Sequence, residues 1–253
     1  MNLKEKINQG SLTLGAWLSI GDENIAEIFS NAGFDWVAID LEHTSISISQ
    51  TCKLIRVIEL AGSSPLVRIP TIDESLIKKV MDSGAHGIII PMVNSAEELR
   101  TAIRATRYPP NGTRGVGLYR AQKYGHDFNG YLDWQSKNPI IVSQIEHINA
   151  LDNLDEIFAE KDLDAFMIGP YDLSCSMGTP GKFDDKDFKN TIERINNKAA
   201  EYNIPRGIHI VEPNLNQLDK TIKEGYKFIA YSVDQRILDV ASRESLKIKQ
   251  INL

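Results

Sequence analysis

Two acidic residues, Glu146 and Asp172, stand at the ends of two consecutive short apolar stretches of the sequence. Carboxylate oxygens are ligands that hard divalent cations prefer, and a cation held by only two side chains keeps positions open for a substrate. Each residue alone could instead be a solvated loop carboxylate, and Asp172 could be a helix N-cap. Their joint placement favours a metal site.

A histidine and an arginine follow two earlier apolar stretches and add the groups that a reaction centre needs. His43 could act as a general base near neutral pH, and Arg68 could hold an enolate oxygen or a carboxylate with its forked guanidinium. Two structural alternatives stay open. His43 could be a hydrogen-bonded loop residue, and Arg68 could form an ion pair with Asp40 or Glu42. Asp82, at the end of a predicted helix, could orient the His43 ring.

The other histidines have positions that favour structural roles. His209 lies in the middle of a predicted strand, where a core residue is expected. His86 begins a strand at the opposite rim, His126 lies in a long loop, and His147 faces away from the pocket if its strand continues. Trp17, at the end of the first strand, either packs in the core or forms a wall of the pocket.

These candidates depend on eight apolar, β-rich stretches that alternate with segments of helical period. The alternation is typical of parallel strands wrapped by helices, and 253 residues match a complete eight-fold barrel. The sequence therefore predicts one α/β domain over residues 1–253, a (β/α)8 TIM barrel with its catalytic groups at the carboxyl ends of the strands. The predicted strands are Leu12–Leu18, Trp36–Asp40, Leu66–Ile69, Gly87–Pro91, Ile140–Ile145, Ala165–Ile168, Gly207–Val211 and Phe228–Ser232. The predicted helices are Glu23–Asn31, Ser47–Leu60, Glu74–Met81, Ala96–Thr106, Leu151–Ala159, Asp187–Tyr202, Leu215–Lys223 and Leu238–Lys249.

A long interval at about residues 108–138 interrupts the alternation. It is rich in Gly, Pro and aromatic residues, and its composition does not mark a domain boundary. Loops of this length inside a compact domain are usually functional. We expect it to form an insertion over the active-site rim.

Composition excludes several classes of protein. Lys and Arg number 28 against 34 Asp and Glu, without basic runs, which argues against nucleic acid as a partner. The first residues are polar and charged, and the apolar stretches are too short to span a bilayer, so we expect a cytoplasmic protein without a membrane partner. Cys52 and Cys175 are too far apart for a CxxC motif, and two reduced thiols are expected.

Two absences narrow the chemistry further. A Schiff-base aldolase needs a desolvated lysine on a barrel strand, and no predicted strand offers one near its carboxyl end. Phosphate-binding barrels carry glycine-rich turns after strands seven and eight, whereas Glu212-Pro213-Asn214 and Val233-Asp234-Gln235 stand there. A phosphosugar enzyme is therefore disfavoured.

At these residues the sequence resembles the HpcH/HpaI family of class II, metal-dependent pyruvate aldolases, whose barrel is of the phosphoenolpyruvate/pyruvate-domain type. The resemblance spans nearly the whole chain. It rests on Gly33-Phe34-Asp35-Trp36 with Asp40-Leu41-Glu42-His43, on Leu66-Val67-Arg68-Ile69-Pro70, on Pro91-Met92-Val93, on Arg107-Tyr108-Pro109-Pro110 with Gly112-Thr113-Arg114-Gly115-Val116-Gly117, and on Gln144-Ile145-Glu146 with Gly169-Pro170-Tyr171-Asp172-Leu173-Ser174.

The resemblance implies a role for each of these residues. Glu146 and Asp172 would bind Mg²⁺, Mn²⁺ or Co²⁺, which chelates the keto and carboxylate oxygens of pyruvate as a Lewis acid. Arg68 would stabilise the enolate oxygen, and His43 with Asp82 would transfer protons. The remaining implied contacts are Gln144, which helps to place the substrate, the backbone amides around Tyr171 and Asp172, which receive its carboxylate, and Arg120, which reaches over the site from the insertion.

The function expected from this resemblance is reversible cleavage of a 4-hydroxy-2-oxo acid, in particular a 2-keto-3-deoxy sugar acid, to pyruvate and an aldehyde. Departures from the family pattern at Leu41, Thr44, Tyr171 and His147 indicate an unusual aldehyde pocket. Two alternatives stay open: an acyl-CoA lyase of the citryl or malyl type, and a barrel that binds an oxo acid without catalysis. The resemblance also implies a homo-oligomer, a hexamer with exchanged C-terminal helices.

Overall fold

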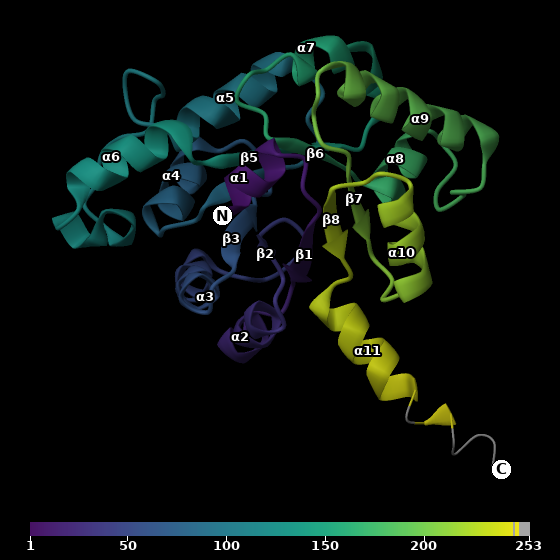
Figure 1. Ribbon diagram of the computed structural model, residues 1–253, viewed down its shortest axis with the longest axis horizontal. Helices are drawn as coiled ribbons and strands as arrows, with labels where there is room; N and C mark the ends of the chain where they lie inside the picture. Colours follow the sequence, from purple (N-terminus) through teal and green to yellow (C-terminus); the bar gives the residue numbers. More distant parts are fainter. Residues whose placement is uncertain (245, 248–253) are drawn as a thin grey trace.

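The computed structural model describes residues 1–244, 246 and 247 of the chain. Eight strands in this part of the chain pair in parallel and close into a barrel in sequence order, with β1 beside β8 (Figure 1). The fold prediction is therefore confirmed. The strands are β1 (Thr13–Leu18), β2 (Trp36–Asp40), β3 (Ser64–Arg68), β4 (Gly87–Ile90), β5 (Ile140–Ile145), β6 (Ala165–Ile168), β7 (Gly207–Ile210) and β8 (Phe228–Tyr231).

Helices follow the strands and surround the barrel, and capping residues in the sequence determine where several of them begin. Ser47 and Ser95, for example, each accept a hydrogen bond from the third helical amide in a capping box. The main helices are α2 (Glu23–Asn31), α3 (Ile48–Leu60), α4 (Glu74–Asp82), α5 (Ala96–Thr106), α7 (Leu154–Phe158), α9 (Lys186–Glu201), α10 (Leu215–Lys223) and α11 (Asp234–Glu244). Shorter additions are α1 (Leu3–Asn8), η1 (Arg120–Gly125), α6 (Phe128–Lys137), η2 (Ile148–Asp152) and α8 (Pro170–Ser176).

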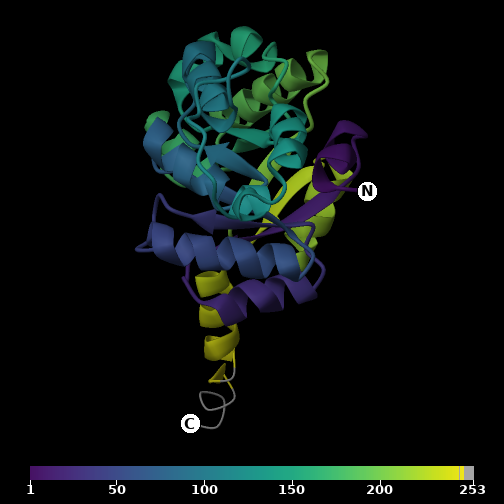
Figure 2. The same cartoon turned by 90° about the vertical axis from the view of Figure 1, so that its left-hand side faces the viewer.

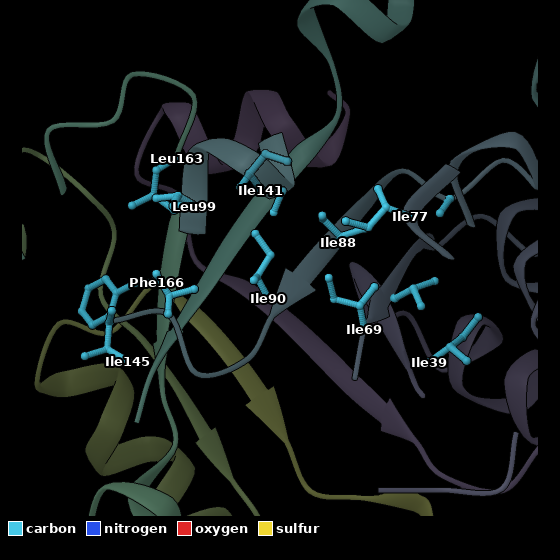
Figure 3. Packing of buried hydrophobic residues seen from close by; sticks show 14 of the residues in the cluster. Ile39, Ile69, Ile77, Ile88, Ile90, Leu99, Ile141, Ile145, Leu163 and Phe166 are labelled. Carbon is cyan, nitrogen blue, oxygen red and sulfur yellow. The ribbon is translucent and has the colours of Figure 1, made fainter. Parts of the chain in front are cut away.

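The larger hydrophobic core lies between the barrel and its helices. Aliphatic side chains from alternate strand positions meet apolar stripes of the helices there (Figure 3). Burial of this kind of side chain contributes about 1.5–3 kcal/mol each. The labelled members are Ile39, Ile69, Ile77, Ile88, Ile90, Leu99, Ile141, Ile145, Leu163 and Phe166.

A second core fills the inside of the barrel. The Trp36 and Phe228 rings stack 4.4 Å apart at an interplanar angle of 4°. A Cβ atom at Gly15 would lie 2.1 Å from the Trp36 ring, so only glycine fits beside it. Leu3 and Ile7 of α1 pack against the same cluster and close its amino-terminal end. The charged interior residues Arg68 and Asp40 lie instead at the carboxyl ends of their strands.

The segment at 108–138 lies at the amino-terminal end of the barrel. The Tyr131 hydroxyl donates to the carbonyl of Met81 at the end of α4, and the Trp134 and His86 rings are 6.0 Å apart beside the start of β4. We expected this segment over the active-site rim, and the structure places it at the opposite end. The reason is topological, because a connection from a helix to the next strand returns to the amino ends of the strands.

The last helix, α11, points away from the barrel (Figures 1 and 2). It begins at Asp234, earlier than predicted, and Leu238 on it is 51% exposed. The predicted continuation through Ser245, Ile248 and Lys249 lies outside the described residues. Among the described helices, none has the length and apolar character needed to cross a membrane.

Candidate active site

Arg68 ends β3 in the carboxyl-terminal layer of the barrel interior and is 8% exposed. Its Nε and Nη2 atoms donate to the two oxygens of Asp40 on β2, at 2.9 and 2.6 Å, and its Nη1 lies 2.9 Å from Glu42 Oε2. Both ion pairs left open by the sequence therefore exist together. Burial would raise the pKa of Asp40, but the hydrogen bonds and charge of Arg68 hold it below its usual value. The guanidinium is thus fixed and permanently charged.

Glu146 follows β5 and is 3% exposed. One of its carboxylate oxygens accepts from the backbone amide of Met92 at 2.7 Å, and the other accepts from Gln144 Nε2 at 3.1 Å. A Cβ atom at Gly169 would lie 2.4 Å from Glu146 Oε2, so the end of β6 approaches this carboxylate closely. Gly169 is the residue that permits the approach.

The charge state of Glu146 depends on its surroundings. Burial raises its pKa to about 7, and the charges of Asp172 and Glu42 act in the same direction, against the Met92 amide and Arg68. The pKa of Glu42 is also raised, chiefly by burial. The charge of Arg68 opposes this rise and the charge of Asp172 adds to it. Glu42, Glu146 and Asp172 therefore share one small region with Arg68, which also pairs with a fourth carboxylate, Asp40, and a divalent cation would stabilise this arrangement.

Asp172 belongs to the first turn of α8, directly after β6. Gly169 is the N-cap and provides no side-chain cap, while Pro170 occupies the first turn. The amides of Tyr171 and Asp172 have no partner within the helix because they belong to its first turn. They are therefore available to an anionic group, the role that the family resemblance implies for them. The Tyr171 side chain is exposed and meets Phe183 edge-on at 5.0 Å.

His43 lies above this layer, open to solvent. Its side chain is 66% exposed, and its Nε2 atom is 3.8 Å from Glu42 Oε2. Its backbone amide approaches Asp40 Oδ1 at 3.4 Å. The structure thus brings His43, Arg68, Glu146 and Asp172 to one end of the barrel.

The donor atoms present fit a divalent cation of the Mg²⁺ class. In the part of the chain that the structure describes, no group of three His, Cys, Asp or Glu side chains could enclose a metal ion, so Glu146 and Asp172 would leave positions for water and substrate. The buried Oε1 atom of Gln144 has no hydrogen-bond partner, which leaves an acceptor free in the same region. The site is therefore open and rich in oxygen donors.

Two predicted site residues, Asp82 and Arg120, lie at the other end of the barrel. Asp82 ends α4, which runs antiparallel to the strands, and burial raises its pKa against the charges of Arg114 and Lys78. Arg120 donates to the Ser83 carbonyl at 3.0 Å and forms an ion pair with Glu59. A single chain therefore does not bring Asp82 to His43 or place Arg120 over the rim.

Two residues at the site were not singled out from the sequence. Met92 turns its amide toward Glu146 from a left-handed backbone (φ 51°), which a sequence pattern does not reveal at a non-glycine residue. His209 was assigned to the core, but its ring stacks on Trp17 at 4.6 Å beside Arg68. The two-residue period of β7 could have shown that His209 faces inward with Gly207.

Comparison with known proteins identifies the family of the chain. The model of the HpcH/HpaI aldolase/citrate lyase family matches residues 13–239. The 2-keto-3-deoxy-L-rhamnonate aldolase of Escherichia coli strain K12 is 34% identical over 245 residues, covering 96% of this chain and 91% of that protein. A crystal structure of an HpcH/HpaI aldolase/citrate lyase family protein from Burkholderia cenocepacia J2315 has a TM-score of 0.92 at 28% identity and covers 98% of each chain. An HpcH/HpaI aldolase from Desulfitobacterium hafniense DCB-2 has a TM-score of 0.90 at 28% identity, covering 99% of this chain and 97% of that one. The chain therefore belongs to the HpcH/HpaI aldolase/citrate lyase family.

Proposed function

We propose that the protein is a divalent-cation-dependent aldolase that reversibly cleaves a 4-hydroxy-2-oxo acid to pyruvate and an aldehyde. The observation that carries the proposal is the buried Glu146 carboxylate, grouped with Asp172 and Glu42 opposite Arg68 at the carboxyl ends of the strands. A cation held there by Glu146 and Asp172 would supply Lewis acidity to the keto group of the substrate.

The residues of the chain have separate roles in this proposal. Cleavage removes the proton of the C4 hydroxyl and breaks the C3–C4 bond, whose electron pair stays on C3 as the pyruvate enolate. Arg68, fixed by Asp40 and Glu42, would neutralise the negative charge that develops on the enolate oxygen. His43, exposed at the mouth, would exchange protons with solvent and substrate. The first-turn amides of α8 would receive the substrate carboxylate, and Gln144 would hold a polar group beside it.

Asp82 and Arg120 enter the proposal differently. Both lie at the opposite end of the same chain, so their proposed roles beside His43 and over the rim require a second copy of the chain. This requirement is consistent with the homo-oligomer expected from the sequence. A cytoplasmic location is part of the same proposal.

The substrate proposed is a 2-keto-3-deoxy sugar acid. The support is the 34% identity to proteins named 2-keto-3-deoxy-L-rhamnonate aldolase. We propose Mg²⁺, Mn²⁺ or Co²⁺ as the cation because the donors are oxygens and the site is open.

The test is release of pyruvate, coupled to lactate dehydrogenase, from a panel of 2-keto-3-deoxy sugar acids and other 4-hydroxy-2-oxo acids. Activity with added Mn²⁺ or Mg²⁺ that disappears with EDTA supports the proposal. Cleavage of an acyl-CoA thioester, with binding of CoA, would instead favour the acyl-CoA lyase. Failure to exchange deuterium into the methyl group of pyruvate, together with no pyruvate release, would indicate a barrel that only binds oxo acids.

A further inference from the structure

Three side chains from three separate strands contact one another in the floor of the candidate site. The Cζ atom of Arg68 on β3 lies 4.9 Å from the centre of the Trp17 ring on β1. The Trp17 ring in turn stacks on His209 of β7, with centroids 4.6 Å apart and an interplanar angle of 27°. The small residue Ala230 of β8 pairs with both Gly15 and His209, which leaves space for the two rings to meet across the barrel.

The hydrogen bonds of Arg68 hold only the edges of its guanidinium group. Asp40 accepts hydrogen bonds from Nε and Nη2, and Nη1 forms an ion pair with Glu42 at 2.9 Å. The central Cζ atom of the group lies over the Trp17 ring, which is only 2% exposed. The tilt of the guanidinium plane therefore depends on where the Trp17 ring lies.

The His209 ring is itself held by the backbone of the neighbouring strand. Its Nε2 atom lies 3.2 Å from the carbonyl oxygen of Ser232, which fixes the tautomer with the proton on Nε2. Ser232 has a left-handed backbone (φ 60°), and its hydroxyl donates to the carbonyl of Val211 at 3.0 Å. The ends of β7 and β8 are thus tied together around this imidazole.

The imidazole is also neutral under working conditions. Burial, with the positive charge of Arg68, lowers the pKa of His209 to about 4, against the Ser232 carbonyl and Asp40, which raise it. A protonated imidazole would place a second positive charge beside Arg68, and the two charges would repel each other. A neutral imidazole packs against Trp17 without this repulsion. The residue behaves as an aromatic support with one polar anchor.

We propose that His209 is a positioning residue, which holds the Trp17 ring against Arg68 and so sets the angle at which the guanidinium meets the substrate oxyanion. The inference rests on the proposed aldolase function, in which Arg68 neutralises the enolate oxygen. Histidine serves here because it offers both a flat face for Trp17 and an Nε2–H group for Ser232.

The test compares His209→Ala, which removes the ring, with His209→Phe, which keeps a flat ring but loses the hydrogen bond. We expect His209→Ala to lower kcat for pyruvate release about 10- to 100-fold with little change in KM, because a displaced catalytic group costs rate rather than binding. His209→Phe should restore most of the rate. Ile208→Ala, on the same strand but in a different hydrophobic cluster, is the matched control and should leave kcat unchanged.

A double-mutant cycle with Arg68→Lys separates positioning from a general loss of stability. Lysine has no flat group to rest on Trp17, so His209→Ala should have little further effect in that background. Deuterium exchange into pyruvate provides a readout for slow variants, and His209→Leu replaces His209→Ala if the latter does not fold. Equal effects in both backgrounds, or a His209→Ala enzyme as fast as the parent, would overturn the inference. A parent protein that releases no pyruvate and exchanges no deuterium would instead overturn the proposed function.

Discussion

At the scale of residues, Glu146 lies in an environment that disfavours its charged form when no cation is bound. Its carboxylate is buried beside two other acidic residues and is held by one backbone amide and one side-chain amide. Glu146→Gln keeps the shape but removes the charge that would bind the metal. We expect this substitution to lower Mn²⁺ affinity and the rate of pyruvate release about 100-fold or more.

Titration calorimetry with Mn²⁺ and the coupled assay measure the two effects of Glu146→Gln. Glu97→Gln, at a side chain 80% exposed on α5, is the control and should change neither. Unchanged Mn²⁺ affinity in Glu146→Gln would remove this residue from the cation site.

Residue types at the ends of apolar stretches are enough to predict part of the candidate site. The carboxyl ends of parallel strands converge at one rim, so Arg68, Glu146 and Asp172 follow from strand order alone. The sequence alone could not show that Arg68 pairs with both Asp40 and Glu42, because the pairing depends on how far the side chains reach between neighbouring strands. Met92 contributes its backbone amide, and no residue type indicates such a role.

At the scale of elements, Glu59 joins the end of α3 to the start of β4 and to the segment at 108–138. Its Oε1 atom lies 3.7 Å from His86 Nε2, and its other oxygen pairs with Arg120. The nearby His86 is the main cause that lowers the pKa of Glu59 to about 2, with Arg120 adding to it against burial. A lowered folded-state pKa means that the stabilisation is present above the unfolded-state pKa, about 4.5, and disappears as pH falls toward 2.

We therefore expect Glu59→Gln to lower the free energy of unfolding by about 1 kcal/mol at pH 7, since the side chain is 40% exposed and solvent screens its charge. The difference from the parent should shrink at pH 3. Denaturant unfolding at pH 7, 5 and 3 measures it, with Glu23→Gln, 46% exposed beside Lys53, as control. A difference that grows on acidification would contradict this account.

Element boundaries were predictable where apolar period and capping residues agree. β2, β5, β6, α2, α5 and α10 begin and end as predicted. The predicted helix Leu151–Ala159 is instead divided into η2 and α7, and neither α6 nor α8 was expected. The aromatic residues of α6 contact the end of α4 and the residue before β4. The spacing of apolar residues within α6 therefore did not predict a helix there. The location of the segment at 108–138 follows from topology, which the expectation of an insertion over the active-site rim did not take into account.

At the scale of the whole molecule, α11 exposes the apolar side chain of Leu238, which we propose a second copy of the chain covers. Its base is anchored, because the buried Asp234 carboxylate accepts from the backbone amides of Ser19 and Ile20 at distances down to 2.7 Å. Leu238 further along is 51% exposed, and the helix points away from the barrel (Figure 2). This arrangement supports the homo-oligomer proposed from family resemblance.

We expect Leu238→Asp to reduce the mass of the particle measured by light scattering after size-exclusion chromatography. Loss of a buried apolar contact in favour of a charge weakens association. The activity should fall with the mass, because Asp82 and Arg120 can reach a carboxyl-terminal rim only from another copy. Leu215→Asp, at an exposed leucine of α10, is the matched control and should leave both unchanged. A monomeric parent protein with full activity would contradict both parts.

The stacked Trp36 and Phe228 rings, together with α1, close the amino-terminal end of the barrel. Substrates and products must therefore enter and leave through the carboxyl-terminal end of the barrel. In the proposed cleavage we expect the aldehyde, which would face the open end, to leave before the keto acid that Arg68 and a bound cation would hold. We therefore expect an ordered reaction, in which pyruvate is the last product released in cleavage and the first substrate bound in synthesis.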